Sequence, residues 1–561
     1  MRLLFLPLLL CSFSVAKTVT YDWEVDWTTA CPDGFCRPVI GINGAWPCPL
    51  VEANLGDTII MNVKNRLGNE TTSIHPHGIF QKGTPQMDGV AGVTQCPIPA
   101  GGSFTHSFVA NPAGTRWYHS HDKAQYPDGL RSPMIIHDRE WERSLGFEEQ
   151  FVFSVSDWYH TQFPYLIHEF FDGGNFNGRT TRGAMPMPDS SLINDTESIT
   201  LEIEPNKKYL LRIVSMAALF PHQISIVEDH DMTIVAIDGF PTKPKDASAI
   251  VISAGQRYDV LITGKANVTK DYTITSEMLD SNMTRTGFLK YISNSTNPSS
   301  KQQKQNYKRA TVVPIDDFIL EPADGQPLLT GVDKSITLPV SYTGKADRRS
   351  TRIKLGNASY VSPKVPTLFT ALTTGSDAEN PIVYGDSVNP YVIRTGQVVQ
   401  IIVQNDDDIQ HPMHLHGYEF QVVARGAGVW DGDESKLPKM PMKRDTANTP
   451  ARGHLVIRIK ANNPGVWVFH CHMEFHVEGG MMATIIESPA TLQKTVRISN
   501  AQLDICRDQG IPTEGNCSGD TLNVLDTSKC NKDPPEEDWG ALINPPVAKR
   551  ALGRRNVRRD L

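Results

Sequence analysis

The chain has 561 residues, of which 39% are hydrophobic and 21% are charged, proportions typical of globular proteins rather than disordered or fibrous ones. This length is enough for three or four domains of about 150 residues each. The formal net charge of −8 gives no reason to expect a nucleic-acid partner. No segment after the N-terminal 16 residues has the roughly 18 consecutive apolar residues of a membrane-spanning helix, so no membrane anchor is expected.

Residues 1–16 have the pattern of a secretory signal peptide. Arg2 gives the charged start, Leu3 to Leu10 form the apolar run, and a small-residue site ends at Ala16. The mature chain is therefore predicted to be secreted, to the medium or the cell wall. Asn-x-Ser/Thr sequons compatible with glycosylation occur at Asn69, Asn194, Asn267, Asn282, Asn294, Asn357 and Asn516.

Beyond the signal, short strand-like runs separated by turn residues predict a β-rich chain. The polar stretch at 293–309 has the composition of an exposed linker. The basic C-terminal end is expected to be disordered. The predicted units are domain one at 17–145, domain two at 146–310, domain three at 330–500 and a cysteine-bearing tail at 501–561.

An internal repeat relates domain one to domain three. GTRWYHSH at 114–121 parallels GVWVFHCH at 465–472, and GDTIIMNVKN leading to HPHG parallels GQVVQIIVQN leading to HPMHLHG. Domain two has similar strands without the paired histidines. Three consecutive β-sandwiches are therefore expected, with metal ligands in the first and third.

Four His-x-His pairs stand at the ends of predicted strands, although 17 histidines in 561 residues would make only about 0.5 such pairs by chance. The pairs are His75 and His77, His119 and His121, His414 and His416, and His470 and His472. Residues i and i+2 of a strand point to the same face, so each pair can bind a shared metal cluster. Eight imidazoles suit three ions between the two copies, and imidazole favours copper or zinc over magnesium or calcium.

The run at 465–482, GVWVFHCHMEFHVEGGMM, predicts a separate mononuclear site. A thiolate, two imidazoles and a thioether form a blue-copper centre, and Cys471, His476 and Met481 with His411 supply these groups. If the run is a strand, Cys471 faces one site while the histidines on either side of it face the other. A structural zinc site would use four ligands, far fewer than are present.

The motifs HPHG, HSH, HPMHLHG and HCHMEFHVEGGM resemble the copper signatures of the multicopper oxidase family. The runs MDGVAGVTQCPIPAG, QYPDG, SPKVPTLFTAL, PMKRDT and NPGVWVFHCHMEFH extend this resemblance, to the fungal ferroxidase and laccase-like branch, as far as about residue 530. The resemblance implies an all-β fold of three consecutive cupredoxin-like Greek-key β-sandwich domains. It also implies four copper ions and an enzyme that couples one-electron oxidation of a donor to reduction of dioxygen to water.

The same resemblance assigns each predicted ligand to a copper type. The type 1 ligands are His411, Cys471, His476 and Met481. The type 2 ligands are His75 and His414. One type 3 ion takes His77, His119 and His472, and the other takes His121, His416 and His470.

Two acids, Asp88 and Glu474, match family acids that supply protons during oxygen reduction. Making water from dioxygen consumes protons, and a positioned carboxylate can relay them. The structural alternatives are that Asp88 is a turn residue before Gly89 and that Glu474 is a solvated loop acid.

The reducing donor is predicted from the residues expected near type 1 copper. Asp407, four residues before His411, matches an iron-binding acid of the ferroxidases, but Met185 stands where their second acid is expected. A thioether is a poor ligand for hard iron and has no charge to attract a cation. A laccase-like oxidase of phenolic or naphthol-like aromatics is therefore favoured, with Met185 as an apolar wall and Asp407 as the base.

An iron(II) oxidase is the alternative, and ascorbate-type or other donors are also left open. A copper carrier without catalysis would need only the type 1 ligands, so the eight further histidines argue against it. A small aromatic donor and dioxygen are the expected partners of a monomeric chain.

Nine cysteines are present. Cys11 leaves with the signal and Cys471 binds metal, so seven remain for disulfides and one of these is free or pairs elsewhere. Cys96 resembles a family cysteine that bridges to the tail, and Cys506 is its expected partner.

Overall fold

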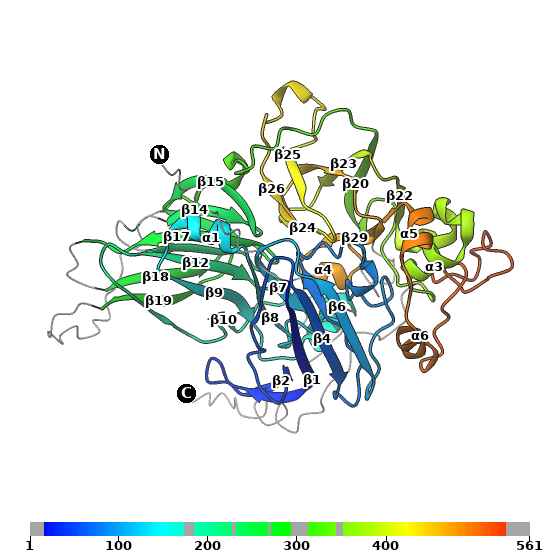
Figure 1. The fold of residues 1–561 in the computed structure, drawn as a ribbon, viewed down its shortest axis with the longest axis horizontal. Helices are drawn as coiled ribbons and strands as arrows, with labels where there is room; N and C mark the ends of the chain where they lie inside the picture. Colours follow the sequence, from blue (N-terminus) through cyan, green and yellow to red (C-terminus); the bar gives the residue numbers. More distant parts are fainter. Residues whose placement is uncertain are drawn as a thin grey trace, which may run out of the picture.

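The computed structural model describes residues 16–172, 185–226, 230, 232–266, 271–292, 312–343 and 352–533. Almost all of the expected signal segment, the linker at 293–309, the basic C-terminal end and the sequons at Asn267 and Asn294 lie outside these residues. Three β units follow one another along the described chain, and short helices gather at the end of the third unit (Figure 1).

The first unit has two four-stranded sheets whose apolar side chains share one core. One sheet contains, in order, β2 (Arg37–Ile42), β1 (Thr18–Ala30), β4 (Thr58–Asn65) and β6 (Ser103–Val109). The other contains β3 (Val51–Asn54), β8 (Arg131–His137), β7 (Gly114–His119) and β5 (His75–His77). Along β4, buried and half-buried residues alternate, because successive side chains of a strand point to opposite faces.

The second unit has a six-stranded and a five-stranded sheet. The larger contains β10 (Ser190–Ile193), β9 (Glu149–Trp158), β12 (Lys208–Ser215), β17 (Arg257–Thr263), β14 (Met232–Ile237) and β15 (Phe240–Ala247). The smaller contains β11 (Thr200–Ile203), β19 (Met283–Tyr291), β18 (Tyr272–Met278), β13 (His222–Ile226) and β16 (Ala249–Ile252). Helices α1 (Arg139–Leu145) and α2 (Phe163–Asp172) flank β9 in the chain.

The third unit repeats this two-sheet plan. Its six-stranded sheet contains β21 (Arg352–Leu355), β20 (Lys334–Thr343), β23 (Val398–Asn405), β28 (Gly453–Lys460), β25 (Phe420–Ala427) and β26 (Lys443–Arg444). Its five-stranded sheet contains β22 (Pro390–Ile393), β30 (Met482–Glu487), β29 (Gly465–Cys471), β24 (His411–Leu415) and β27 (Thr446–Thr449). Its α-helices are α3 (Thr367–Thr373), α4 (Glu474–Glu478), α5 (Pro489–Thr495) and α6 (Asn500–Arg507). The short 3-10 turns are η1 (Pro85–Met87), η3 (Asp317–Ile319), η4 (Gly375–Glu379), η5 (Pro381–Tyr384), η6 (Asp386–Val388) and η7 (Glu434–Lys436).

The predicted repeat is confirmed in the strand pairing. In the first unit β5 pairs antiparallel with β7 and places His75 opposite His119. In the third unit β24 pairs antiparallel with β29 and places His414 opposite His470. The all-β fold is confirmed as well, whereas the domain limits given above stay predictions.

The described cysteines form three disulfides, Cys31–Cys36, Cys96–Cys506 and Cys517–Cys530. The pairing expected for Cys96 is therefore confirmed, and Cys48 is the buried free thiol left by the odd count. Among the described residues, no helix is both long enough and apolar enough to span a membrane.

Candidate metal centre

The mononuclear site forms where β24, β29 and α4 meet. Sγ of Cys471 lies 3.5 Å from Nδ1 of His476 and 3.8 Å from Nδ1 of His411, and these two nitrogens are 3.1 Å apart. Met481 is fully buried, and its carbonyl accepts a hydrogen bond from the Cys471 N–H. Three ligand atoms within 4.8 Å of one another, all buried, are suitably placed to share one metal ion.

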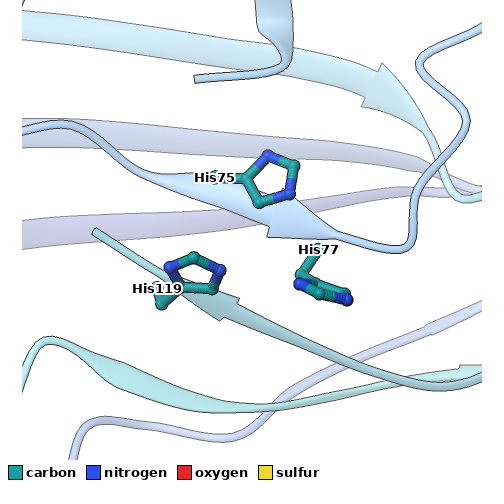
Figure 2. A group of neighbouring side chains, drawn as sticks. All are labelled: His75, His77 and His119. Carbon is teal, nitrogen blue, oxygen red and sulfur yellow. The ribbon is translucent and has the colours of Figure 1, made fainter. Parts of the chain in front are cut away.

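The eight paired histidines converge at the interface between the first and third units. Nε2 of His416 lies 3.1 Å from Nε2 of His470, and Nε2 of His472 lies 3.3 Å from Nδ1 of His77. Figure 2 shows His75 and His77 of β5 next to His119 of β7. Three triplets of these histidines have ligand atoms within 4.8 Å of one another: His75, His77 and His119; His75, His414 and His416; and His121, His416 and His470.

Strand β29 separates the two sites by side-chain alternation. All seven of its residues are buried because the strand lies inside its sheet with both faces covered. Cys471 faces His411 and His476, whereas His470 and His472 contact histidines of the four pairs. The predicted division of this peptide between two sites agrees with these contacts.

Hydrogen bonds orient several rings of the cluster through their outer nitrogens. A backbone carbonyl lies 2.6 to 2.8 Å from Nδ1 in four of them. The pairs are His75 with Asp88, His119 with Ser120, His414 with Asp445, and His470 with Cys471. Because a carbonyl only accepts, Nδ1 carries the proton in each neutral ring, and the lone pair of Nε2 points into the cluster.

The nitrogens that face the inside of the cluster are suited to bind metal ions. Nε2 of His75, His119 and His414 is buried and has no hydrogen-bond partner among the described residues. Burial, and then repulsion from neighbouring rings, lowers the pKa of His119 and His416 well below the usual value for histidine. Neutral imidazoles with unsatisfied lone pairs are the form in which histidine binds copper.

Asp88 contacts two of the predicted ligands. Its Oδ2 lies 2.9 Å from Nδ1 of His416, and its carbonyl oxygen lies 2.6 Å from Nδ1 of His75. The turn needs glycine next, because Gly89 has a φ of +81° and an added Cβ would lie 1.8 Å from the Ile74 carbonyl oxygen. Asp88 is thus a turn residue that also contacts the cluster.

Glu474 is buried at the start of α4 and is not a solvated loop acid. Burial, and then the nearby carboxylate of Glu478, raises the pKa of Glu474 well above its usual value. Glu474 and Glu478 both line a cavity of about 550 Å³ that reaches His121 and His470. Glu474 therefore lies in the same cavity as histidines of the cluster.

Asp407 contacts the mononuclear site from outside. Its Oδ2 lies 3.4 Å from Nε2 of His411, and the same oxygen accepts a hydrogen bond from the Tyr342 hydroxyl. Burial raises the pKa of Asp407, but the close contact with His411 and the hydrogen bond from Tyr342 outweigh it and lower the pKa below the usual range. A carboxylate with so low a pKa is a weak base, which does not suit the predicted role of deprotonating a phenol.

Three residues at these sites were not predicted. Tyr342 comes from β20 and Arg257 from β17, and neither lies in a recognisable motif. Asp445 lies in the run PMKRDT, which signals the family without indicating a role. Nη1 of Arg257 and Oδ1 of Asp445 both lie beside Nε2 of His77.

Comparison with known proteins decides the family. Three family models, each described as multicopper oxidase, match residues 24–141, 149–294 and 360–491. The chain belongs to the multicopper oxidase family. It is a copper-dependent oxidoreductase that uses dioxygen and a small-molecule donor, and its cofactors are one type 1, one type 2 and two type 3 copper ions.

The relatives are named for iron transport. The iron transport multicopper oxidase fetC of Epichloe festucae is 42% identical over 538 residues, which cover 93% of this chain and 84% of the relative. The corresponding oxidase fio1 of Schizosaccharomyces pombe is 38% identical, with coverages of 94% and 85%.

Among solved structures, an iron-import oxidase is more similar to this chain than a laccase is. The crystal structure of Fet3p, described as a multicopper oxidase that functions in iron import, is 33% identical and has a TM-score of 0.86, covering 92% of this chain and 99% of Fet3p. The laccase from Botrytis aclada is 28% identical with a TM-score of 0.73, covering 88% and 91%.

These relatives contradict the prediction of a laccase-like oxidase with an aromatic donor, which is wrong. The prediction gave too much weight to Met185. Met185 is half-buried and packs against the large apolar core shared by the second and third units, so packing accounts for its apolar side chain. Gly183 and Ala184 of the same loop lie outside the described residues.

Proposed function

We propose that this multicopper oxidase oxidises iron(II) and passes the electrons to dioxygen. The observation that carries the proposal is the Asp407 carboxylate beside His411, together with relatives that are named for iron transport. Iron(II) is a cation that binds oxygen ligands, and an acid whose pKa is lowered remains charged over a wide pH range.

The surroundings of Asp407 favour a cationic donor. Asp406 stands on one side of it and is exposed, whereas the exposed Asp408 on the other side is paired with Arg452, which offsets its charge. The side chain of Asp407 is itself 20% exposed, so a small ion can reach it from solvent. Adjacent acids raise the local concentration of cations, an effect that weakens with added salt.

When bound, the coppers supply one-electron oxidation of the donor and four-electron reduction of dioxygen to water. His411, Cys471, His476 and Met481 would hold the type 1 ion, and the eight paired histidines would hold the other three. The peptide from His470 to His472 joins the two sites covalently through Cys471. Glu474 would hold a proton beside the cluster.

We also propose that the chain is secreted and glycosylated. Three disulfides support folding in an oxidising compartment. Asn282 and Asn357 are exposed, as an acceptor must be. By contrast, Asn516 is buried and its Nδ2 donates to the carbonyls of Val524 and Asp526, so we expect it to remain unmodified. Peptide mapping of the secreted protein before and after deglycosylation would test whether Asn282 and Asn357 carry glycans and whether Asn516 does not.

The proposed reaction is tested by kinetics with two classes of donor. The copper-loaded protein is assayed for oxygen uptake with iron(II) and with hydroquinone and catechol, at one pH and one oxygen concentration. We expect kcat/KM to be at least about tenfold higher for iron(II) than for either phenol. A higher kcat/KM for a phenol would overturn the proposal.

A further inference from the structure

A second aspartate, Asp445, also contacts the histidine cluster. Its carbonyl oxygen lies 2.8 Å from Nδ1 of His414, and its Oδ1 lies 3.4 Å from Nε2 of His77. Asp445 immediately precedes β27, the strand that pairs with β24, and this pairing brings its carbonyl to His414. One residue thus contacts ligands from both copper-binding units.

Asp88 and Asp445 make equivalent contacts in the two copies of the repeat. Each uses its backbone carbonyl for a histidine of its own unit, His75 for Asp88 and His414 for Asp445. Each uses its carboxylate for a histidine of the other unit, His416 for Asp88 and His77 for Asp445. The two histidines bound by carbonyls are the predicted type 2 ligands, and the two bound by carboxylates belong to different type 3 ions. Each of the two copper-binding units therefore contributes one acid that contacts histidines of both units.

His77 differs from the rings oriented through Nδ1, because its Nε2 points outward and its Nδ1 points inward. The inner Nδ1 lies 3.3 Å from Nε2 of His472. A neutral ring that offers the lone pair of Nδ1 to a metal carries its proton on Nε2 and needs an acceptor there. Nη1 of Arg257 lies 3.0 Å from this Nε2, but its two hydrogens are donated to Oδ1 of Asp445 and to the Gly255 carbonyl. The charged acceptor within reach of an Nε2 proton is therefore the Asp445 carboxylate, 3.4 Å away.

Two arginines hold Asp445 in place. Nη1 and Nη2 of Arg257 lie 2.6 and 2.5 Å from the two carboxylate oxygens, and Nη1 of Arg116 lies 3.4 Å from Oδ2. Both guanidinium groups are completely buried. A bidentate arginine fixes the plane of a carboxylate. Arg257 belongs to the second unit, which supplies none of the predicted metal ligands.

We propose that Asp445 is a positioning residue for the trinuclear copper cluster. Its carboxylate accepts the Nε2 proton of His77 and so directs Nδ1 toward a type 3 ion, while its carbonyl holds the type 2 ligand His414. Through Arg257, the metal-free second unit maintains this arrangement. The proposal concerns the cluster alone and does not depend on whether iron or a phenol is the donor.

The test uses the copper-loaded variant Asp445→Asn, which keeps the size of the side chain and removes its charge. The readouts are copper per chain by elemental analysis and the share of that copper visible by electron paramagnetic resonance. An intact type 3 pair is magnetically coupled and silent, so two of the four coppers are visible in the wild type. We expect the visible share in the variant to rise from one half toward all of the bound copper, with the blue absorption of the Cys471 site retained.

Asp317→Asn is the matched control. Asp317 is buried in the same network of ion pairs, where it binds Arg425 and Arg444, and no predicted ligand is among its hydrogen-bond or ion-pair partners in the described chain. The control should keep the wild-type copper content and visible share. If Asp445→Asn does not fold, Asp445→Glu retains the charge but moves the carboxylate by one methylene, and it should show the same rise. The proposal is overturned if the Asp445 variants keep the wild-type visible share, or if Asp317→Asn raises it equally.

Discussion

Oδ2 of Asp407 lies 3.4 Å from Nε2 of His411, while Nδ1 of the same ring lies 3.8 Å from Sγ of Cys471. A single imidazole ring therefore separates a partly exposed carboxylate from the ligand atoms of the mononuclear site. An iron(II) ion bound by Asp407 would be linked to the mononuclear site through this carboxylate and the His411 ring. This relationship is the structural basis of the proposed iron oxidation.

Tyr342→Phe should shift the pH dependence of iron oxidation. Burial raises the pKa of Asp407, but the close contact with His411 and the hydrogen bond from Tyr342 lower it overall. Removing the Tyr342 hydroxyl should raise that pKa by about one unit, because a hydrogen bond to a charged group contributes about 1.5 kcal/mol. Since Asp407 is charged only above its pKa, kcat/KM for iron(II) should begin to fall at a higher pH on acidification. A pH profile whose acid limb does not move would contradict this role for Tyr342.

Glu474→Gln should slow the enzyme equally with every donor. A glutamine cannot release a proton, and a positioned acid contributes about 100-fold or more to a proton-transfer step. Oxygen-uptake assays should therefore show kcat reduced by about 100-fold with both iron(II) and hydroquinone. Glu487→Gln is the control, because Glu487 is also buried but bonds Tyr418 and Thr395 in the third unit. A loss confined to one donor would show that Glu474 acts on the donor and not on oxygen reduction.

The disulfide between Cys96 and Cys506 should contribute most to stability among the three. It joins residues 410 apart in sequence, whereas Cys31 and Cys36 are only 5 apart. A cross-link that closes a longer loop restricts the unfolded chain more, and losing one typically costs about 2–5 kcal/mol. Thermal unfolding of the Cys96→Ser/Cys506→Ser protein should begin several degrees lower than that of the Cys31→Ser/Cys36→Ser protein. Equal unfolding temperatures would contradict this expectation.

Local patterns predicted which histidines and which cysteine come together, because strand alternation is a property of the sequence itself. The spacing of His470, Cys471 and His472 is sufficient to divide this peptide between two sites. Contacts between units could not be predicted in the same way. Tyr342 and Arg257 reach the two sites from strands with no metal-binding pattern, and only the packed fold brings them there.

The donor was mispredicted for a related reason. The inference rested on one side chain, Met185, whose apolar character follows from its packing against the core. The ionisation of Asp407 depends on two contacts that only the folded chain makes, an ion-pair contact with His411 and a hydrogen bond from Tyr342 of another strand. The sequence showed the acid but not its low pKa.

The role of Asp407 is tested most directly by the ratio of kcat/KM for iron(II) to kcat/KM for hydroquinone. This ratio is measured for the wild type, for Asp407→Asn and for Asp408→Asn. Asp408 is the matched control, because it is the next acid along the chain, is 80% exposed and pairs with Arg452 instead of a predicted copper ligand. We predict that Asp407→Asn lowers the ratio by about tenfold or more, while Asp408→Asn leaves it nearly unchanged. An unchanged ratio in Asp407→Asn would contradict the account.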